Sequence, residues 1–135
     1  MTRPGEFPPM VVEAIWNRDR GYCALPGCVN PGLVRERRGE PFNGGWSIQH
    51  REARGAGGVK RNSARPHLVL PSNGVLLCGT GTTGCHGKVE AHRVPSDWGF
   101  SVSRHGVLRP AQVPIVHALH GRVFLDDDGG WELAA

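Results

Sequence analysis

The four cysteines are the feature that most constrains how this chain can fold. They form two pairs, Cys23/Cys28 and Cys78/Cys85, with four and six residues between the members. Glycine lies within both intervals, so each pair can turn and bring its two sulfurs together. Hydrophobic residues are only 39% of the 135-residue chain, and 20 glycines plus 11 prolines leave a small core that needs a cross-link. We expect one structural zinc ion on all four thiolates, with disulfides or unliganded thiols as alternatives.

The length predicts one domain, and the mixture of helical and strand patterns places it in the α+β class. Four segments are expected along the chain. They are a flexible arm over residues 1–9, a helix with the first cysteine pair over 10–45, a central unit over 46–94, and a β-rich tail over 95–135.

Hydrophobic periodicity and turn residues predict the elements within these segments. Apolar residues at helical spacing indicate a first helix that ends at Arg20-Gly21, and Pro95 limits a second helix. The expected elements are helices at 10–19 and 85–93, strands at 46–50, 74–78 and 98–103, and a hairpin of 122–125 with 131–133.

Positive charge is concentrated in one region of the chain. The net charge is +4, but residues 35–65 alone carry eight Lys or Arg against three Glu. Cations on a glycine-rich loop suit contacts to phosphates, and a solvated surface loop is the alternative. The expected DNA-binding residues are Arg51, Arg54, Lys60, Arg61 and Arg65.

The sequence contains no apolar run of membrane-span length and no apolar secretory segment near Met1. We therefore expect no membrane association and a cytoplasmic location. In that reducing compartment, thiolates bind metal more often than they form disulfides.

Two histidines and an asparagine occur in an order that suits phosphodiester hydrolysis. His50 ends the first strand of the central unit, Asn73 precedes the second, and His86 opens the helix. Hydrolysis requires a base for water and a cation for the phosphate and the leaving oxygen. Histidine can serve as that base near neutral pH, and an asparagine amide can fix a neighbouring loop. We expect His50 to act as base and His86 as metal ligand; ordinary core or surface histidines are the alternative.

This stretch resembles the HNH endonucleases, which carry the ββα-metal motif, and in particular the small free-standing HNH proteins of tailed bacteriophages. The resemblance is carried by Gln49-His50-Arg51, by Arg54-Gly55-x-Gly57-Gly58, and by the Cys-Gly-x-Gly-Thr-Thr-Gly-Cys-His-Gly block at residues 78–87. It covers residues 18–99. It implies a ββα-metal core stapled by a four-cysteine zinc site, with an N-terminal helix and a C-terminal β-rich extension.

Carried over by position, the resemblance makes His50 the general base, Asn73 the central asparagine and His86 the final metal-binding histidine. Two positions depart from the family. Gln49 stands where relatives have Asp or His, and its neutral amide oxygen should bind a hard cation more weakly. Glu90 stands where many relatives have His; it shares a helix face with His86 and can also bind metal, or be a solvated carboxylate.

The remaining histidines receive little weight. A helix extending past Glu90 would place His92 on a different face from His86, which makes it a poorer ligand, although its nearness keeps it a candidate. No role is assigned to the others, which are expected to be ordinary surface or core residues: His67, His105, His117 and His120.

The expected activity is therefore that of a metal-dependent DNA endonuclease in which His50 activates a water. Besides structural Zn²⁺ it would use one catalytic divalent ion, Mg²⁺, Mn²⁺, Ni²⁺ or Zn²⁺. The resemblance implies double-stranded DNA as substrate, a role in phage genome packaging with terminase and portal proteins as partners, and the bacterial host cytoplasm as location. Because Gln49 is uncharged, a zinc-stabilised DNA-binding or packaging accessory without cleavage is the alternative; a restriction-like defence enzyme shares the chemistry.

Overall fold

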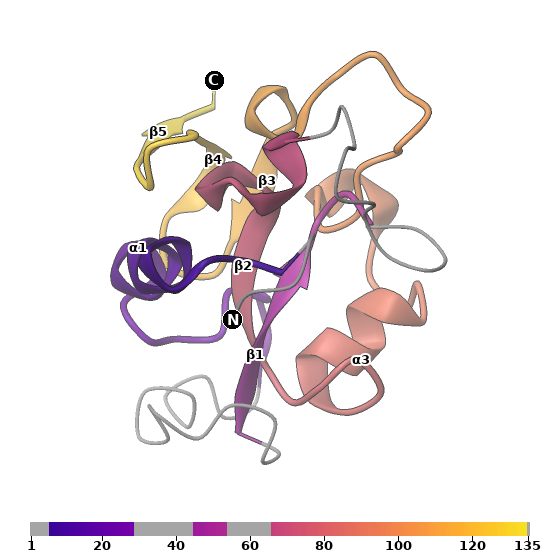
Figure 1. Cartoon of the computed structure of the whole chain (residues 1–135). Helices are drawn as coiled ribbons and strands as arrows, with labels where there is room; N and C mark the ends of the chain where they lie inside the picture. Colours follow the sequence, from indigo (N-terminus) through magenta and orange to yellow (C-terminus); the bar gives the residue numbers. More distant parts are fainter. Residues whose placement is uncertain (1–5, 29–44, 54–65, 135) are drawn as a thin grey trace.

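The computed structural model describes residues 6–28, 45–53 and 66–134. Within these ranges the chain is a mixed α+β structure with two α-helices and two small antiparallel sheets, which confirms the expected fold class (Figure 1). No helix of the described ranges is long and apolar enough to cross a membrane. Four of the expected DNA-binding residues lie outside these ranges, namely Arg54, Lys60, Arg61 and Arg65.

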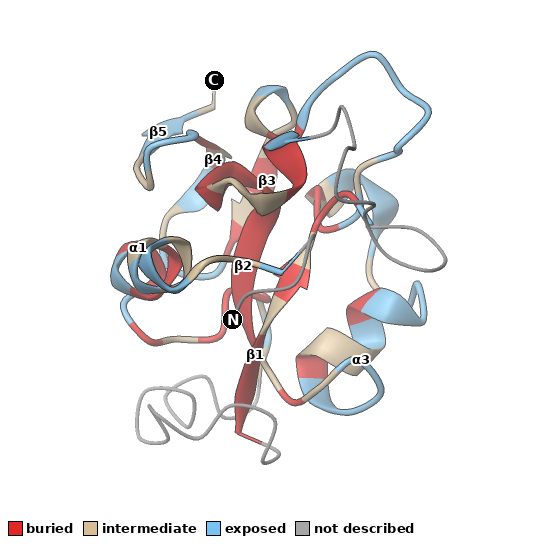
Figure 2. Cartoon of the chain, in the orientation of Figure 1, coloured by how far each residue is buried: buried red, intermediate tan, exposed pale blue. Residues whose placement is uncertain are grey.

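A two-stranded antiparallel sheet lies at the centre of the structure. It consists of β1 (Trp46–His50) and β2 (Gly74–Cys78), as predicted, and its register runs from Trp46 opposite Cys78 to His50 opposite Gly74. Figure 1 shows α1 (Pro9–Asp19) on one side of this pair and α3 (Gly84–Glu90) on the other. β2 is consequently buried along almost its whole length (Figure 2).

Helix α1 begins one residue before its predicted start and ends, as predicted, at the Arg20-Gly21 step. Arg20 ends it by adopting a left-handed backbone with φ 56°. Ile15 and Trp16 are buried in the core, as their spacing indicated. Its last turn also buries Arg18 and Asp19, which the hydrophobic pattern did not predict. These two charges form an ion pair at 2.8 Å that holds α1 against β2.

Helix α3 ends at Glu90, three residues earlier than predicted. His92 has a left-handed φ of 56°, and its N–H donates to the Val89 carbonyl. The Arg93 N–H donates to the Lys88 carbonyl, which completes a Schellman motif. This motif satisfies carbonyls of the last helical turn and redirects the chain. The position expected for His92 on a helical face was therefore wrong, because His92 lies beyond the end of the helix.

The tail contains a second sheet of order β3-β4-β5, formed by β3 (Ile115–His117), β4 (Gly121–Leu125) and β5 (Trp131–Leu133). The predicted hairpin of 122–125 with 131–133 is confirmed by the β4–β5 pairing, whereas β3 was not predicted. Short 3-10 turns occupy much of the rest: η1 (Pro66–Val69), η2 (Pro71–Asn73), η3 (Ser96–Trp98) and η4 (Pro110–Gln112).

The strand expected at 98–103 does not form. Gly99 takes a left-handed φ of 82°, and a Cβ there would lie 2.0 Å from the Pro114 carbonyl oxygen, so glycine is required. The Gly99 and Phe100 carbonyls accept hydrogen bonds from the side chains of Arg51 and Gln49. Those side chains supply the hydrogen-bond donors that the backbone of a neighbouring strand would supply in a sheet. Of this segment, only Val102 makes a bridge, a single parallel one.

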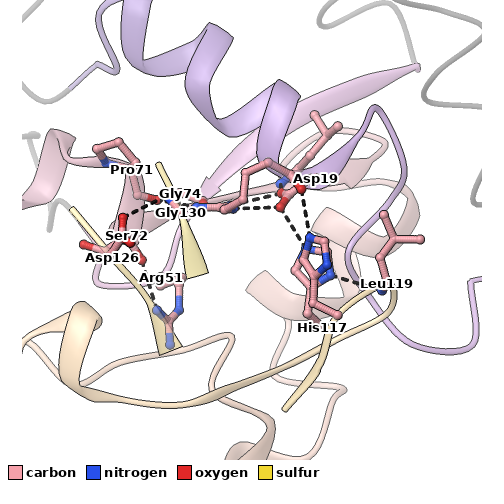
Figure 3. Close-up of polar contacts among 12 residues, drawn as sticks. Asp19, Arg51, Pro71, Ser72, Gly74, His117, Leu119, Asp126 and Gly130 are labelled. Atoms are coloured by element: carbon pink, nitrogen blue, oxygen red, sulfur yellow. Dashed lines mark hydrogen bonds and ion pairs between the residues drawn. The ribbon is translucent and has the colours of Figure 1, made fainter. Parts of the chain in front are cut away.

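Arg51 is a structural residue, and the expectation that it binds DNA is corrected. Its side chain is only 2% exposed. The guanidinium donates hydrogen bonds at 2.8–3.0 Å to four carbonyl oxygens from three segments, those of Ser72, Gly99, and Pro110 with Val113. Figure 3 shows the bond to Ser72. Burial, and secondly the charge of Arg18, lower the pKa of Arg51 to about 9, so it remains charged at neutral pH. Arg51 therefore ties the end of β1 to the tail.

Replacing Arg51 should reduce stability rather than DNA affinity. We expect Arg51→Met to lower the free energy of unfolding by about 3 kcal/mol, because buried carbonyls lose their donors. Chemical denaturation measures this loss. Arg122→Met, at an exposed arginine of β4, is the matched control and should be nearly neutral. A stable Arg51→Met protein with weakened DNA binding would restore the original interpretation.

Candidate functional site

The four cysteines converge on one point. Their sulfur atoms all lie within 4.8 Å of one another, and the Cys28 and Cys78 sulfurs are 3.8 Å apart. A tetrahedral zinc ion with Zn–S bonds of about 2.3 Å would place neighbouring sulfurs about 3.8 Å apart. All four residues are free cysteines, and Cys23 and Cys85 are buried. The cluster can therefore hold a metal ion such as zinc.

The cluster joins segments that are distant in sequence. Cys23 follows α1, Cys78 ends β2 and Cys85 lies in the first turn of α3. The Cys78 and Cys85 backbone amides donate to the Cys23 and Cys78 sulfurs, both at 3.4 Å. Contacts with the sulfurs of Cys23 and Cys85 lower the pKa of Cys78, whereas contacts with Cys78 and Cys85 raise the pKa of Cys23, so the close sulfurs share protons among themselves. A bound ion would hold α1, β2 and α3 together.

Ser47, on β1, fixes the state of the His86 ring. The Ser47 hydroxyl donates its only hydrogen to the Gly79 carbonyl at 2.7 Å. Its oxygen lies 2.5 Å from His86 Nδ1 and so must accept a hydrogen from that nitrogen. In the neutral imidazole, His86 Nε2 then carries a lone pair. Burial of the ring lowers the pKa of His86, and the Glu90 charge offsets this only in part, which is consistent with the neutral form.

Glu90 lies one helical turn after His86, and its carboxylate faces that lone pair. The Glu90 Oε1 atom is 3.2 Å from His86 Nε2. Two acceptors repel each other at this distance unless a cation or a proton lies between them. Metal–ligand bonds of about 2.1 Å place adjacent ligand atoms roughly 3.0–3.4 Å apart. The pair therefore has the spacing of two ligands that share one ion, and Ser47 acts as the partner that orients the histidine.

Gln49 contributes an unsatisfied oxygen to the same face of β1. Strand alternation places Gln49 beside Ser47 on the side that α3 covers. Its side chain is 2% exposed, and its Nε2 donates to the Phe100 carbonyl at 2.6 Å. Its Oε1 is buried and has no hydrogen-bond partner among the described residues. A buried amide oxygen without a donor is costly, and a cation would satisfy it.

Asn73 holds the chain that follows His50. It is fully buried, and its Oδ1 accepts from the Glu52 N–H at 2.7 Å. Its Nδ2 donates to the Glu52 carbonyl at 3.2 Å and to the Leu68 carbonyl at 2.9 Å. The Arg51 N–H donates to the Asn73 carbonyl, which extends the β1–β2 pairing by one step. Asn73 is thus a clamp at the end of the strand that carries His50.

His50 lies at the end of β1, within the strand, and therefore shares the face of Ile48 rather than that of Gln49. Its ring stacks on Phe7, with ring centroids 4.3 Å apart. Phe7 belongs to the segment expected to be a flexible arm, but here it packs against the strand. The structure thus places Gln49, His86 and Glu90 on the α3 side of β1 and His50 on the opposite face, so it does not bring the expected base together with the expected metal ligands.

Two buried polar clusters were missed by sequence reasoning. The first joins Glu52 to His67, whose Nε2 lies 2.9 Å from Glu52 Oε2. His67 Nδ1 in turn lies 2.6 Å from the guanidinium of Arg109. No local motif identifies this set, because its members come from three separate segments.

The second cluster joins Asp19 to two histidines of the tail. His117 Nε2 lies 2.8 Å from Asp19 Oδ1 (Figure 3). The His120 ring stacks between His117 and Trp131. Their ligand atoms are within 4.8 Å of one another, close enough for a metal. However, both Asp19 oxygens already accept hydrogen bonds, and His117 Nδ1 accepts from the Leu119 N–H. We interpret this cluster as a structural tie between α1 and the tail.

Comparison with known proteins leaves the site to be interpreted from its own geometry, because no family model, no curated protein and no solved structure matches this chain.

Proposed function

We propose that this protein is a metal-dependent DNA endonuclease of the HNH type. The observation that carries the proposal is the His86–Glu90 pair. His86 Nε2 lies 3.2 Å from a carboxylate oxygen of Glu90, while the Ser47 hydroxyl lies 2.5 Å from the other ring nitrogen. The unsatisfied oxygen of Gln49 supports an ion at this face. The pairing of β1 with β2 and the packing of α3 against them suit the expected ββα-metal core.

Each residue has a definite task in the proposed reaction. His86 and Glu90 hold one divalent ion, Mg²⁺, Mn²⁺, Ni²⁺ or Zn²⁺, with the Gln49 oxygen as a neutral third ligand. When bound, that ion supplies positive charge to the phosphate and to the leaving oxygen. The role of base falls to His50 through the sequence resemblance alone, because its ring stacks on Phe7 on the face of β1 opposite Gln49; Asn73 fixes the strand end that presents it. The four cysteines hold a structural zinc that takes no part in the chemistry.

The sequence resemblance extends this proposal to a biological setting. The substrate would be double-stranded DNA, and the role would be phage genome packaging together with terminase and portal proteins in the host cytoplasm. A DNA-binding accessory without cleavage is the competing function. The observation that favours it is the ligand set itself, because Gln49 adds no charge to the single carboxylate of Glu90.

Nicking of supercoiled plasmid by the zinc-loaded protein, with Mg²⁺, Mn²⁺, Ni²⁺ or Zn²⁺ added, tests this function. We expect wild type to nick with at least one ion. Gln49→Asp should lower the ion concentration for half-maximal nicking, on the order of tenfold, because it adds a charged ligand.

Gln49→Asn is the matched control, since it shortens the side chain equally, also withdraws from the Phe100 carbonyl, and adds no charge. If Gln49→Asp nicks DNA and wild type nicks with none of the four ions, the accessory function is favoured for the natural protein. Silence of both proteins would contradict the nuclease assignment.

A further inference from the structure

The buried pair of Glu52 and His67 lies where two segments of the chain begin and end. The chain leaves the described region after Glu52 and Ala53 and returns at Pro66, next to His67. Glu52 and His67 are both buried and are paired at 2.9 Å, so the two ends of that basic loop meet.

The second segment, residues 103–109, is held at both ends by contacts with residues at the end of β1 and with His67. Before it, Val102 forms a parallel bridge with Glu52 and donates its N–H to the Arg51 carbonyl at 2.8 Å. At its end, the Arg109 guanidinium lies 2.6 Å from His67 Nδ1. Both ends of this segment are therefore held beside the strand end that carries His50, and Asn73 clamps the backbone of Glu52 there.

Between these ends the segment is exposed and basic. All residues from 103 to 109 are exposed, including Arg104 and Arg109, and Val107 is 94% exposed. Figure 1 shows it as an orange arm on the same side of the molecule as α3, away from β5. The fold thus presents Arg104 and Arg109 beside the strand end that carries His50, in addition to the cations that the sequence places at 54–65.

The contact with His67 prepares Arg109 to bind an anion. His67 Nε2 lies against the Glu52 carboxylate, which requires a hydrogen on that nitrogen when the ring is neutral. The Arg109 Nη1 atom lies 2.6 Å from His67 Nδ1 and 3.0 Å from His67 Nε2, so the guanidinium packs against the imidazole ring. This contact restricts the motion of the guanidinium. Arg109 is an exposed residue, and a guanidinium carries its donors in a fork that matches phosphate oxygens.

We propose that residues 103–109 form a second DNA-contacting element, in which Arg104 and Arg109 bind backbone phosphates of the duplex. This inference rests on the proposed nuclease function and specifies how the same site would hold its substrate. Contacts of this kind carry no sequence information; they fix the position of the duplex and make its binding dependent on salt.

The test is the salt dependence of binding to a mixed-sequence DNA duplex. It uses the full zinc-loaded chain without added divalent ions, so that no cleavage occurs. We expect Arg104→Ala and Arg109→Ala each to reduce the slope of log affinity against log salt by about 0.9, because each removes one phosphate contact. Arg122→Ala, at an exposed arginine on β4, is the matched control and should leave the slope unchanged.

Unchanged slopes in both loop variants, with wild type binding DNA, would overturn the proposal for this segment. Equal losses in Arg122→Ala would also overturn it, because they would indicate a general charge effect. Plasmid nicking by the same preparations separates the two hypotheses. If wild type nicks DNA but the loop variants have unchanged salt slopes, the nuclease function stands and only the proposal for residues 103–109 is wrong. If the loop variants have reduced salt slopes but wild type never nicks DNA, the DNA contact of residues 103–109 stands and the nuclease function is contradicted.

Discussion

Removal of the metal from the four cysteines is expected to unfold the protein. The cluster connects the end of α1, the end of β2 and the start of α3, and Cys23 is fully buried in the core. Structural zinc contributes an apparent binding free energy of about 10–16 kcal/mol in zinc-finger peptides at neutral pH. A domain of ordinary stability has only about 5–15 kcal/mol in total. The metal contribution is therefore as large as the whole stability of the fold.

Three measurements examine this expectation. Purified protein should contain about one zinc ion per chain, chelation should abolish the circular dichroism of the folded state, and Cys28→Ser should yield misfolded or insoluble protein. Thr82→Ser, at an exposed position between Cys78 and Cys85, is the control and should fold normally. If the metal-free protein has the same melting temperature as the zinc-loaded protein, the four cysteines do not stabilise the fold by binding metal.

The central elements were predictable because local pattern and global packing agree there. Alternation gave β1 its correct bounds, and the apolar run of 74–78 gave β2. Glycine and paired cysteines marked the turns, and the structure brings the four sulfurs together as the spacing indicated. The face of β1 that meets α3 was also predictable, since Ser47 and Gln49 alternate with Trp46 and Ile48. The role of Ser47 was nevertheless missed, because it depends on the position of Gly79.

The remaining errors concern residues whose partners are distant in sequence. Arg51 looked like a DNA contact because it begins a basic loop, yet the tail supplies three of the four carbonyls that enclose it. The same contacts prevent a strand at 98–103. His92 was predicted to lie on a helix because the sequence has no glycine at the left-handed position that follows α3. Composition and periodicity do not encode such contacts, so these features required the three-dimensional structure.

Loss of His50 and loss of His86 should both abolish cleavage, but for different reasons. His50→Ala removes the base and should lower the nicking rate roughly 10²–10⁴-fold while the protein still binds divalent metal, since a base acts only in the transition state. His86→Ala removes a ligand whose ring is already oriented by Ser47, so it should lose the catalytic ion as well as the activity.

Titration of the zinc-loaded variants with Mn²⁺ separates the two roles. The His50→Ala protein should bind one ion with wild-type affinity, and the His86→Ala protein should bind none at this site. His92→Ala is the matched control. It removes an exposed histidine just beyond the end of α3 and should behave as wild type in both binding and cleavage.

The initial rate of plasmid nicking in saturating Mn²⁺ tests the central claim most directly, measured for wild type, His50→Ala, His86→Ala and His92→Ala. The predicted result is nicking by wild type and His92→Ala, with the other two reduced at least about a hundredfold and His86→Ala not restored by excess ion. Cleavage by His86→Ala at the wild-type rate would contradict the assignment of this site.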